Sequence, residues 1–233
     1  MNFRATETQG TLYVISTPIG NLGDLSPRAV ECLRNVALVC AEDTRTFAIL
    51  AKKFSLDVSC VSYHDFNERS RTTQIISRLR EGDNIALVSE AGTPTISDPG
   101  YRLVHQCRLS GITVTAVPGA CALIAALSIS GLPTDRFYFG GFLPQKKGKR
   151  RRVLEEACAS GVTSIFYESP YRVLKTLEEL ETLAPERSLF LARELTKKFE
   201  ETLSGTAREI LSSLKQRASI KGELTLIVSG ADD

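Results

Sequence analysis

Short apolar runs alternate with segments of helical pattern along this chain, and that order constrains its fold more than any other feature. In the first half, runs with the length of a buried strand occupy residues 11–16, 37–41, 84–88 and 112–117. Helices are expected at 27–35, after residue 45, at 72–80, at 101–109 and from 119 to 129. Ser26 and Pro27 supply an N-cap and a first-turn proline for the first of these helices. This alternation predicts an α/β fold with a largely parallel sheet.

A cluster of turn-forming residues interrupts the alternation near the middle of the chain. Residues 130–135 read Ser-Gly-Leu-Pro-Thr-Asp, and strands and helices start afresh beyond them. The strands expected there are 136–140, 162–167, 188–192, 199–203 and 223–228, and the helices are 150–159, 169–183 and 206–217. Ser169 with Pro170, and Thr206 with Glu209, mark the starts of the last two helices. We therefore expect two α/β domains, at residues 1–126 and 127–233, with a cleft between them.

Composition excludes several classes of protein. The chain has 29 basic and 27 acidic residues, so no global field indicates a nucleic acid partner. Its 6 cysteines include no C-x-x-C pair and mostly lie in apolar stretches, which suits reduced thiols better than disulfides or zinc ligands. Neither a secretory signal nor an apolar stretch of roughly 18 residues occurs. We expect a soluble, cytoplasmic protein with no membrane span.

The loop that follows the run at 84–88 is rich in residues that shape the backbone. Gly92 and Gly100 allow positive φ and close approach, while Pro94 and Pro99 fix φ and remove donors. Ligands of α/β sheets bind outside the carboxyl ends of strands. The loop is therefore a candidate floor for a small-molecule site, although an ordinary pair of turns would have a similar composition.

A second loop, at residues 17–21, follows the first expected strand and precedes a helix. This is where α/β proteins often place phosphate or cofactor loops. The loop matches neither G-x-G-x-x-G nor G-x-x-x-x-G-K-[ST], because the lysine is absent. The sequence thus argues against a dinucleotide or a nucleoside triphosphate as the ligand.

Charged side chains follow the run at 37–41. Glu42, Asp43 and Arg45 stand at a strand's carboxyl end, where they can orient a polar substrate or take a proton from it. The alternative is structural, with Asp43 or Thr44 capping a helix and Arg45 paired to an acid. His64 lies in a polar loop, which favours a site role for it.

One dense basic cluster precedes and opens the helix expected at 150–159. A run of charge is usually a solvated helix face, but cations at a helix start are disfavoured by the macrodipole. An anionic partner would relieve that cost, and nucleic acid phosphates are the natural candidate. The residues expected to contact such a partner are Lys146, Lys147, Lys149, Arg150, Arg151 and Arg152, with Lys197 as an extension of the same surface.

Taken in order, many motifs of the chain resemble those of the small-subunit ribosomal RNA methyltransferase I family, whose members have the tetrapyrrole methylase fold. They lie at residues 13–22, 41–45, 62–64, 91–100, 117–119, 130–137, 141–144, 167–170, 192–197 and 221–223. The resemblance implies a two-domain class III methyltransferase with mixed sheets flanked by helices and S-adenosylmethionine in the interdomain cleft. It also implies a homodimer, no required metal, and 2′-O-methylation of a cytidine ribose in the decoding region of 16S rRNA, within an assembled or nearly assembled 30S subunit.

The resemblance also implies a set of site residues. The cofactor would contact Pro18, Ala91, Gly92, Thr93, Ile96, Cys121 and Ala122 from the first part of the chain, and Glu168 and the segment around Ala192 from the second domain. At 118–121 this chain has Pro-Gly-Ala-Cys where members often have Pro-Gly-Pro-Ser or Pro-Gly-Pro-Cys.

A methyl transfer to a ribose hydroxyl requires in-line alignment and removal of one proton. Asp43, Glu42 and His64 are the candidate bases, in that order, with Arg45 beside them. Two other functions stay open at this point. One is a tetrapyrrole C-methyltransferase on the same fold, and the other is a noncatalytic module that binds the cofactor or RNA without turnover.

Overall fold

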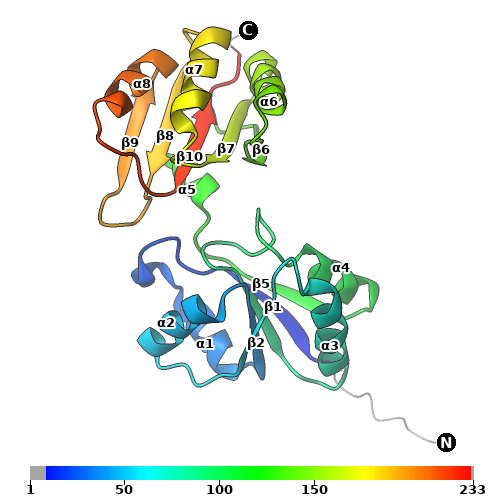
Figure 1. Cartoon of the computed structure of the whole chain (residues 1–233). Coiled ribbons are helices and arrows are strands. Elements are labelled where there is room, and N and C mark those ends of the chain that lie inside the picture. Colours follow the sequence, from blue (N-terminus) through cyan, green and yellow to red (C-terminus); the bar gives the residue numbers. More distant parts are fainter. Residues whose placement is uncertain (1–8, 232–233) are drawn as a thin grey trace, which may run out of the picture. The chain divides into compact units, whose positions relative to one another are not determined.

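The computed structural model describes residues 9–231, which divide between Cys121 and Ala122 into two compact units (Figure 1). The division falls immediately before helix α5 (Ala122–Ile129), whereas the expected boundary after residue 126 lies inside that helix. Within the described range, no helix is both long and apolar enough to cross a bilayer.

The first unit is built on a parallel five-stranded sheet with the strand order β3-β2-β4-β1-β5. Its strands are β1 (Thr11–Ile15), β2 (Leu38–Ala41), β3 (Cys60–Ser62), β4 (Ile85–Val88) and β5 (Thr113–Val117). Every residue of β2 and β4 is buried, as a parallel sheet covered on both faces requires. The expected parallel sheet is confirmed here. The edge strand β3 was not expected, because three residues are too short for a recognisable apolar run.

Helices cover both faces of this sheet (Figure 1). On one face, α1 (Pro27–Asn35) and α2 (Thr44–Phe54) pack through Leu33 and Phe47. On the other, α3 (Glu68–Arg80) and α4 (Tyr101–Leu109) pack through Leu79 and Leu103. The neighbouring strands β1 and β4 thus send their connections to opposite faces, which is the arrangement that places ligands at the carboxyl edge of such a sheet.

Local signals explain where these helices begin. Ser26 accepts a hydrogen bond from the Ala29 amide (3.1 Å) and Pro27 occupies the first turn, so α1 has its expected bounds. Helix α3 begins at Glu68 rather than near residue 72. The difference arises because its first turn consists of charged and hydroxyl residues, which carry no apolar periodicity.

The second unit has a mixed five-stranded sheet with the order β6-β7-β10-β8-β9. Its strands are β6 (Phe137–Phe142), β7 (Thr163–Glu168), β8 (Leu189–Arg193), β9 (Glu201–Gly205) and β10 (Leu224–Val228). Only β6 and β7 are parallel among these pairs, so the mixed sheet that the family resemblance implies is confirmed for this unit. The connection from β8 to β9 is short, and a short connection joins antiparallel strands, whereas parallel strands need a long crossover.

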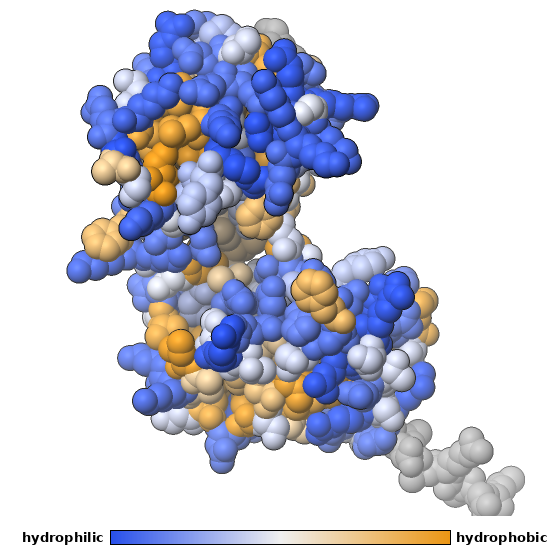
Figure 2. All heavy atoms as spheres, viewed as in Figure 1, coloured by the Kyte–Doolittle hydropathy of each residue, from blue (hydrophilic) through white to orange (hydrophobic). Residues whose placement is uncertain are grey.

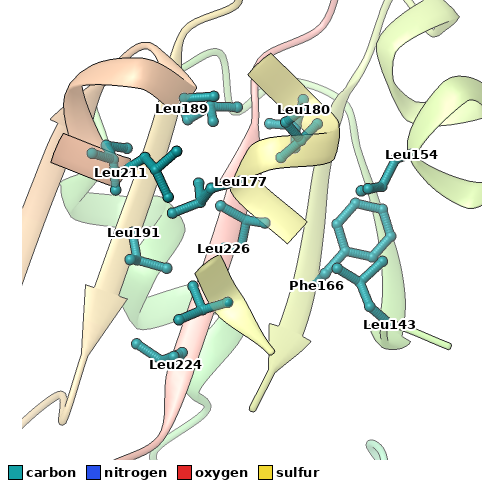
Figure 3. Close-up of a cluster of buried hydrophobic side chains, with 14 of the residues drawn as sticks. Leu143, Leu154, Phe166, Leu177, Leu180, Leu189, Leu191, Leu211, Leu224 and Leu226 are labelled. Carbon is teal, nitrogen blue, oxygen red and sulfur yellow. The ribbon is translucent and has the colours of Figure 1, made fainter. Parts of the chain in front are cut away.

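The core of this unit lies between the sheet and three helices, α6 (Lys147–Ala159), α7 (Val173–Leu183) and α8 (Ala207–Lys215). Figure 3 shows leucines of α6, α7, α8 and the strands converging with Phe166. The capping box expected at Thr206 and Glu209 is present at the start of α8. Helix α7 begins at Val173, not at residue 169, because residues 170–172 form a turn that precedes it.

Candidate functional site

Three loops of the first unit are joined at the carboxyl ends of β1, β4 and β5. The amide of Thr17 donates to the Gly92 carbonyl (2.8 Å) and the amide of Gly92 donates back (3.1 Å). The Thr93 hydroxyl donates to the Ala120 carbonyl (3.1 Å) and lies 3.0 Å from the Ser16 hydroxyl. These bonds tie the loop after β4 to both neighbouring loops, so the three form one rigid floor.

The loop from 89 to 100 has positive φ at residues that rarely adopt it. Gly92 has a φ of +89°, and a Cβ there would lie 3.3 Å from a methyl of Ile19. Thr95 (φ 75°) and Ser97 (φ 63°) also have positive φ, although neither is glycine. Such residues are uncommon outside functional sites and tight turns, because the surrounding structure must hold the strain.

Six of the residues expected to contact a cofactor lie in these three loops. Pro18 and Gly92 are buried, Ala91, Thr93 and Cys121 are half-buried, and Ile96 presents an exposed apolar side chain. Ala122 begins α5 and belongs to the second unit.

Glu168 is not available to a ligand through its side chain, which corrects the expectation. The side chain is fully buried. One carboxylate oxygen accepts the Ser169 amide (2.7 Å) and pairs with Arg172 (2.8 Å), and the other accepts the Thr176 hydroxyl (2.6 Å). Its carboxylate therefore fixes the turn that starts α7. Ala192 is similarly buried within β8, so its side chain presents no surface to a ligand.

Glu42, His64 and Glu90 follow the carboxyl ends of β2, β3 and β4, and the charges of the other two act on Glu42. The pKa of Glu42 is raised, chiefly by burial, while a hydrogen bond from the Glu90 amide lowers it and the Glu90 and Asp65 carboxylates raise it further. A carboxylate with a raised pKa is a better proton acceptor than an ordinary one. Glu42 is therefore the strongest base among the acids expected at the site.

His64 is oriented by Asn67, which sequence reasoning did not single out. The Asn67 side-chain oxygen accepts the His64 amide (3.0 Å), and its amide nitrogen lies 3.2 Å from the imidazole Nε2. An amide nitrogen only donates, so Nε2 is the acceptor and a neutral imidazole carries its proton on Nδ1. Nδ1 is buried and has no hydrogen-bond partner in the described part of the chain. A buried donor without a partner points to a bound ligand or water.

The structural alternative for Asp43 is confirmed. Its carboxylate caps α2 by accepting the Arg45 amide (2.7 Å), and it also pairs with the Arg45 guanidinium (3.0 and 2.5 Å). Hydrogen bonds from Arg45 lower the pKa of Asp43 to about 2. A carboxylate held in this way is a poor base.

The basic cluster occupies the start of α6, where Lys146, Lys147 and Lys149 are exposed. Arg151 and Arg152 are also exposed, and each pairs with a glutamate one turn later, at 2.8 and 3.1 Å. Figure 2 shows that hydrophilic residues cover most of the visible face of both units. The start of α6 is thus an exposed cationic surface.

Arg150 and Lys197 were expected on that surface, but neither belongs to it. Arg150 is only 4% exposed and forms two hydrogen bonds to the Glu179 carboxylate, at 3.1 and 2.7 Å. It is a buried link between α6 and α7, and this corrects its assignment to an RNA contact. Lys197 is half-buried and pairs with Glu194 (2.8 Å) and Glu223 (3.0 Å).

Sequence reasoning missed the buried hydroxyls of Ser16 and Thr17 and the carboxylate of Glu90. The available signal was their position, since each lies within two residues of the end of an apolar strand. Between residues 9 and 231, no group of three His, Cys, Asp or Glu side chains could hold a metal ion.

Comparisons with known proteins agree with this arrangement. A sequence model of the tetrapyrrole (corrin/porphyrin) methylases matches residues 11–211. The chain is 49% identical to a protein of Synechocystis sp. over 95% of this chain and 80% of that protein. It is 47% identical to one of Escherichia coli O157:H7, over 97% of this chain and 80% of that protein. Both relatives are named ribosomal RNA small subunit methyltransferase I.

Solved structures share the fold at low identity. A diphthine synthase matches with a TM-score of 0.70 at 12% identity, covering 94% of this chain and 89% of that one. Uroporphyrin-III-C-methyltransferase from Thermus thermophilus matches with a TM-score of 0.65 at 19% identity, covering 95% and 94%. Fold, motifs and relatives agree, and the chain belongs to the tetrapyrrole methylase family and, within it, to the ribosomal RNA small subunit methyltransferase I proteins.

Proposed function

We propose that this protein transfers a methyl group from S-adenosylmethionine to the 2′-hydroxyl of a cytidine ribose in the decoding region of small-subunit rRNA. The observation that carries the proposal is the 49% identity over 95% of the chain to a ribosomal RNA small subunit methyltransferase I. The relative's name does not specify the ribose, the base or the decoding region, and these parts of the proposal rest on the motif resemblance.

The joined loops of the first unit fit the proposed cofactor. Pro18, Ala91, Gly92, Thr93 and Ile96 would hold it, together with Cys121. Exposed Ile96 offers an apolar surface, and the linked hydroxyls and carbonyls offer polar contacts. The Nδ1 of His64 adds a buried donor at the same edge of the sheet that has no partner among residues 9–231. When bound, S-adenosylmethionine supplies an already activated methyl group.

The protein's own task is then to align the ribose and remove its proton. Glu42 is our first candidate for the base, because its pKa is raised by burial. His64 ranks below Glu42, because Asn67 already occupies the lone pair of Nε2 and the neutral ring carries its proton on Nδ1. Asp43 moves to last place because Arg45 occupies both of its oxygens. Arg45 itself remains 89% exposed in its side chain and can contact a phosphate near the acceptor.

The exposed cations of α6 would contact the phosphate backbone. Lys146, Lys147 and Lys149 have no acidic partner in the described part of the chain, so they contribute most, and Arg151 and Arg152 contribute less. An rRNA substrate within an assembled or nearly assembled 30S subunit would place the protein in the cytoplasm.

A homodimer is part of the proposal. The edge strand β6 supports it, because Phe137, Tyr138 and Phe142 are 40%, 57% and 61% exposed there. Exposed aromatic residues on a sheet edge commonly mark a surface covered by another chain. Light scattering after size exclusion should give twice the 25.5 kDa mass of the chain.

The direct test incubates the protein with methyl-labelled S-adenosylmethionine and small ribosomal subunits that lack the modification. The expected result is label on the 2′-oxygen of one cytidine, identified after nuclease digestion. Label on the base, label on a uroporphyrinogen offered in parallel, or cofactor binding without transfer would each overturn the proposal. The last two outcomes would favour a tetrapyrrole C-methyltransferase and a noncatalytic module, respectively.

A further inference from the structure

Two adjoining hollows run along helices α3 and α4 of the first unit. One has a volume of about 510 Å³ and lies between the two helices, where Arg69 and Arg80 help to line it. The other has a volume of about 280 Å³ and reaches the end of the loop after β4, at Asp98 and Gly100. Arg102 and Gln106 line both hollows, so the two lie next to each other. Together they form a path, the α3–α4 track, that leads away from the candidate site within one unit.

The smaller hollow contains an aromatic platform. Tyr101 stacks on His105 with ring centroids 5.6 Å apart and an angle of 13° between the planes. A pair with this spacing in a helix also stabilises the first turn of α4. Tyr101 nevertheless stays 71% exposed, which leaves most of its ring surface free for a second planar partner. Bases of single-stranded RNA stack on such side chains.

The two hollows differ in the charge of the side chains that line them. Asp65, Glu68 and Asp98 line the smaller one, which disfavours a phosphate there and suits the amino groups of a base. Glu68 also neutralises Arg102 (2.8 Å). In the larger hollow, Arg69 and Arg80 form no ion pair with any described residue, and Arg80 only donates to the Ser110 hydroxyl (3.3 Å). Free guanidinium groups beside hydroxyls suit phosphate oxygens.

We propose that the α3–α4 track binds a single RNA strand next to the acceptor nucleotide, with a base stacked on Tyr101 and phosphates at Arg69 and Arg80. The inference rests on the proposed function and adds a contact surface outside the basic cluster of α6. The alternation of a base-stacking hollow with a cationic hollow favours RNA over an acidic peptide, which would need no aromatic platform.

The test uses the full chain and a fluorescent oligocytidine RNA as the probe. Tyr101→Ala should weaken binding on the order of tenfold, whereas Tyr101→Phe, which keeps the ring, should bind like the wild type. Arg69→Gln with Arg80→Gln should lower the slope of log affinity against log salt by about 1.4, because two single-strand phosphate contacts contribute about 0.7 each.

The matched control for charge is Lys52→Gln with Lys53→Gln. Both lysines are exposed on α2, which covers the opposite face of the same sheet, so this variant removes equal charge elsewhere. It should leave the salt slope within about 0.3 of the wild type. Thermal melting should stay unchanged in Tyr101→Phe and in the arginine and lysine variants, whereas Tyr101→Ala, which loses the stack on His105, should melt slightly lower.

The outcomes separate this inference from the proposed function. If the wild type methylates small subunits while Tyr101→Ala and the arginine variant bind the probe normally, the track is overturned and the function stands. If Tyr101→Ala weakens probe binding and the wild type transfers no methyl group, the track stands and the function falls. Weakening by the arginine variant alone would refute base stacking and point to an acidic peptide or to nonspecific charge.

Discussion

The buried ion pair of Arg150 and Glu179 gives the sharpest prediction. Their side chains are 5% and 11% exposed, and the two groups form paired hydrogen bonds of 3.1 and 2.7 Å between α6 and α7. Replacing Arg150 with Met keeps most of the aliphatic volume but leaves the Glu179 carboxylate without its cation. Breaking a buried pair in this way costs about 3–5 kcal/mol.

The partial exposure of Glu179 lets water reach one side, so we expect about 3 kcal/mol for Arg150→Met. That is a large part of the roughly 5–15 kcal/mol that holds a typical domain folded. The double variant Arg150→Met with Glu179→Met removes both charges and should cost less than about 1 kcal/mol. The two sites therefore couple by at least about 2 kcal/mol.

Urea denaturation is the appropriate assay, and far-UV circular dichroism should follow it because the chain contains no tryptophan. With an m-value of about 2 kcal/mol/M, Arg150→Met should lower the midpoint by about 1.5 M. Arg151→Met is the control on the same helix. Its pair with Glu155 is exposed on the surface, so it should cost no more than about 0.5 kcal/mol.

The same variants distinguish the structural role of Arg150 from an RNA contact. The double variant should keep the salt dependence of RNA binding, whereas Lys147→Gln with Lys149→Gln should reduce it. If Arg150→Met were as stable as the wild type and lost RNA affinity, the burial argument would be refuted.

Three further predictions concern the site and its supports. Glu42→Gln should lower methyl transfer about 100-fold, whereas Asp43→Asn keeps it within a few-fold. Wild-type turnover should fall at acid pH because protonation of Glu42 removes the base, and the fall should begin above the usual carboxyl range because the pKa of Glu42 is raised. A turnover that stays constant as the pH is lowered through this range would exclude Glu42 as the base. Gly100 has a φ of +129°, and a Cβ there would lie 2.7 Å from a methyl of Leu87, so Gly100→Ala should lower the free energy of unfolding in urea by about 2 kcal/mol or more. The control Gly148→Ala places its methyl in open space within a helix and should raise that free energy slightly. The pKa of Glu201 is lowered to about 2 by two arginines, so the stability it contributes is present above about pH 4.5 and is lost as pH falls toward 2. After discounting for solvent, that contribution is about 1–2 kcal/mol, and Glu201→Gln should show no such loss over this pH range.

The sequence by itself determined the order of the elements and several of their bounds. Helix α1 starts at Pro27 because its cap and its first-turn proline are adjacent in the chain, and α8 starts with a capping box for the same reason. The parallel sheet of the first unit follows from apolar runs that must be buried on both faces. The positions of the candidate loops follow as well, since each comes directly after such a run.

Tertiary structure alone decided which charged groups are free to act. Arg150 lies in a basic run that reads as one exposed surface, yet its partner Glu179 is 29 residues away on another helix. Glu168 reads as a site acid, but α7 folds back and encloses it through Thr176. The track along α3 and α4 brings together residues of two helices that belong to separate βα units. Helix caps and apolar periodicity depend on neighbours in the chain, whereas burial and ion pairing depend on residues that only folding brings together.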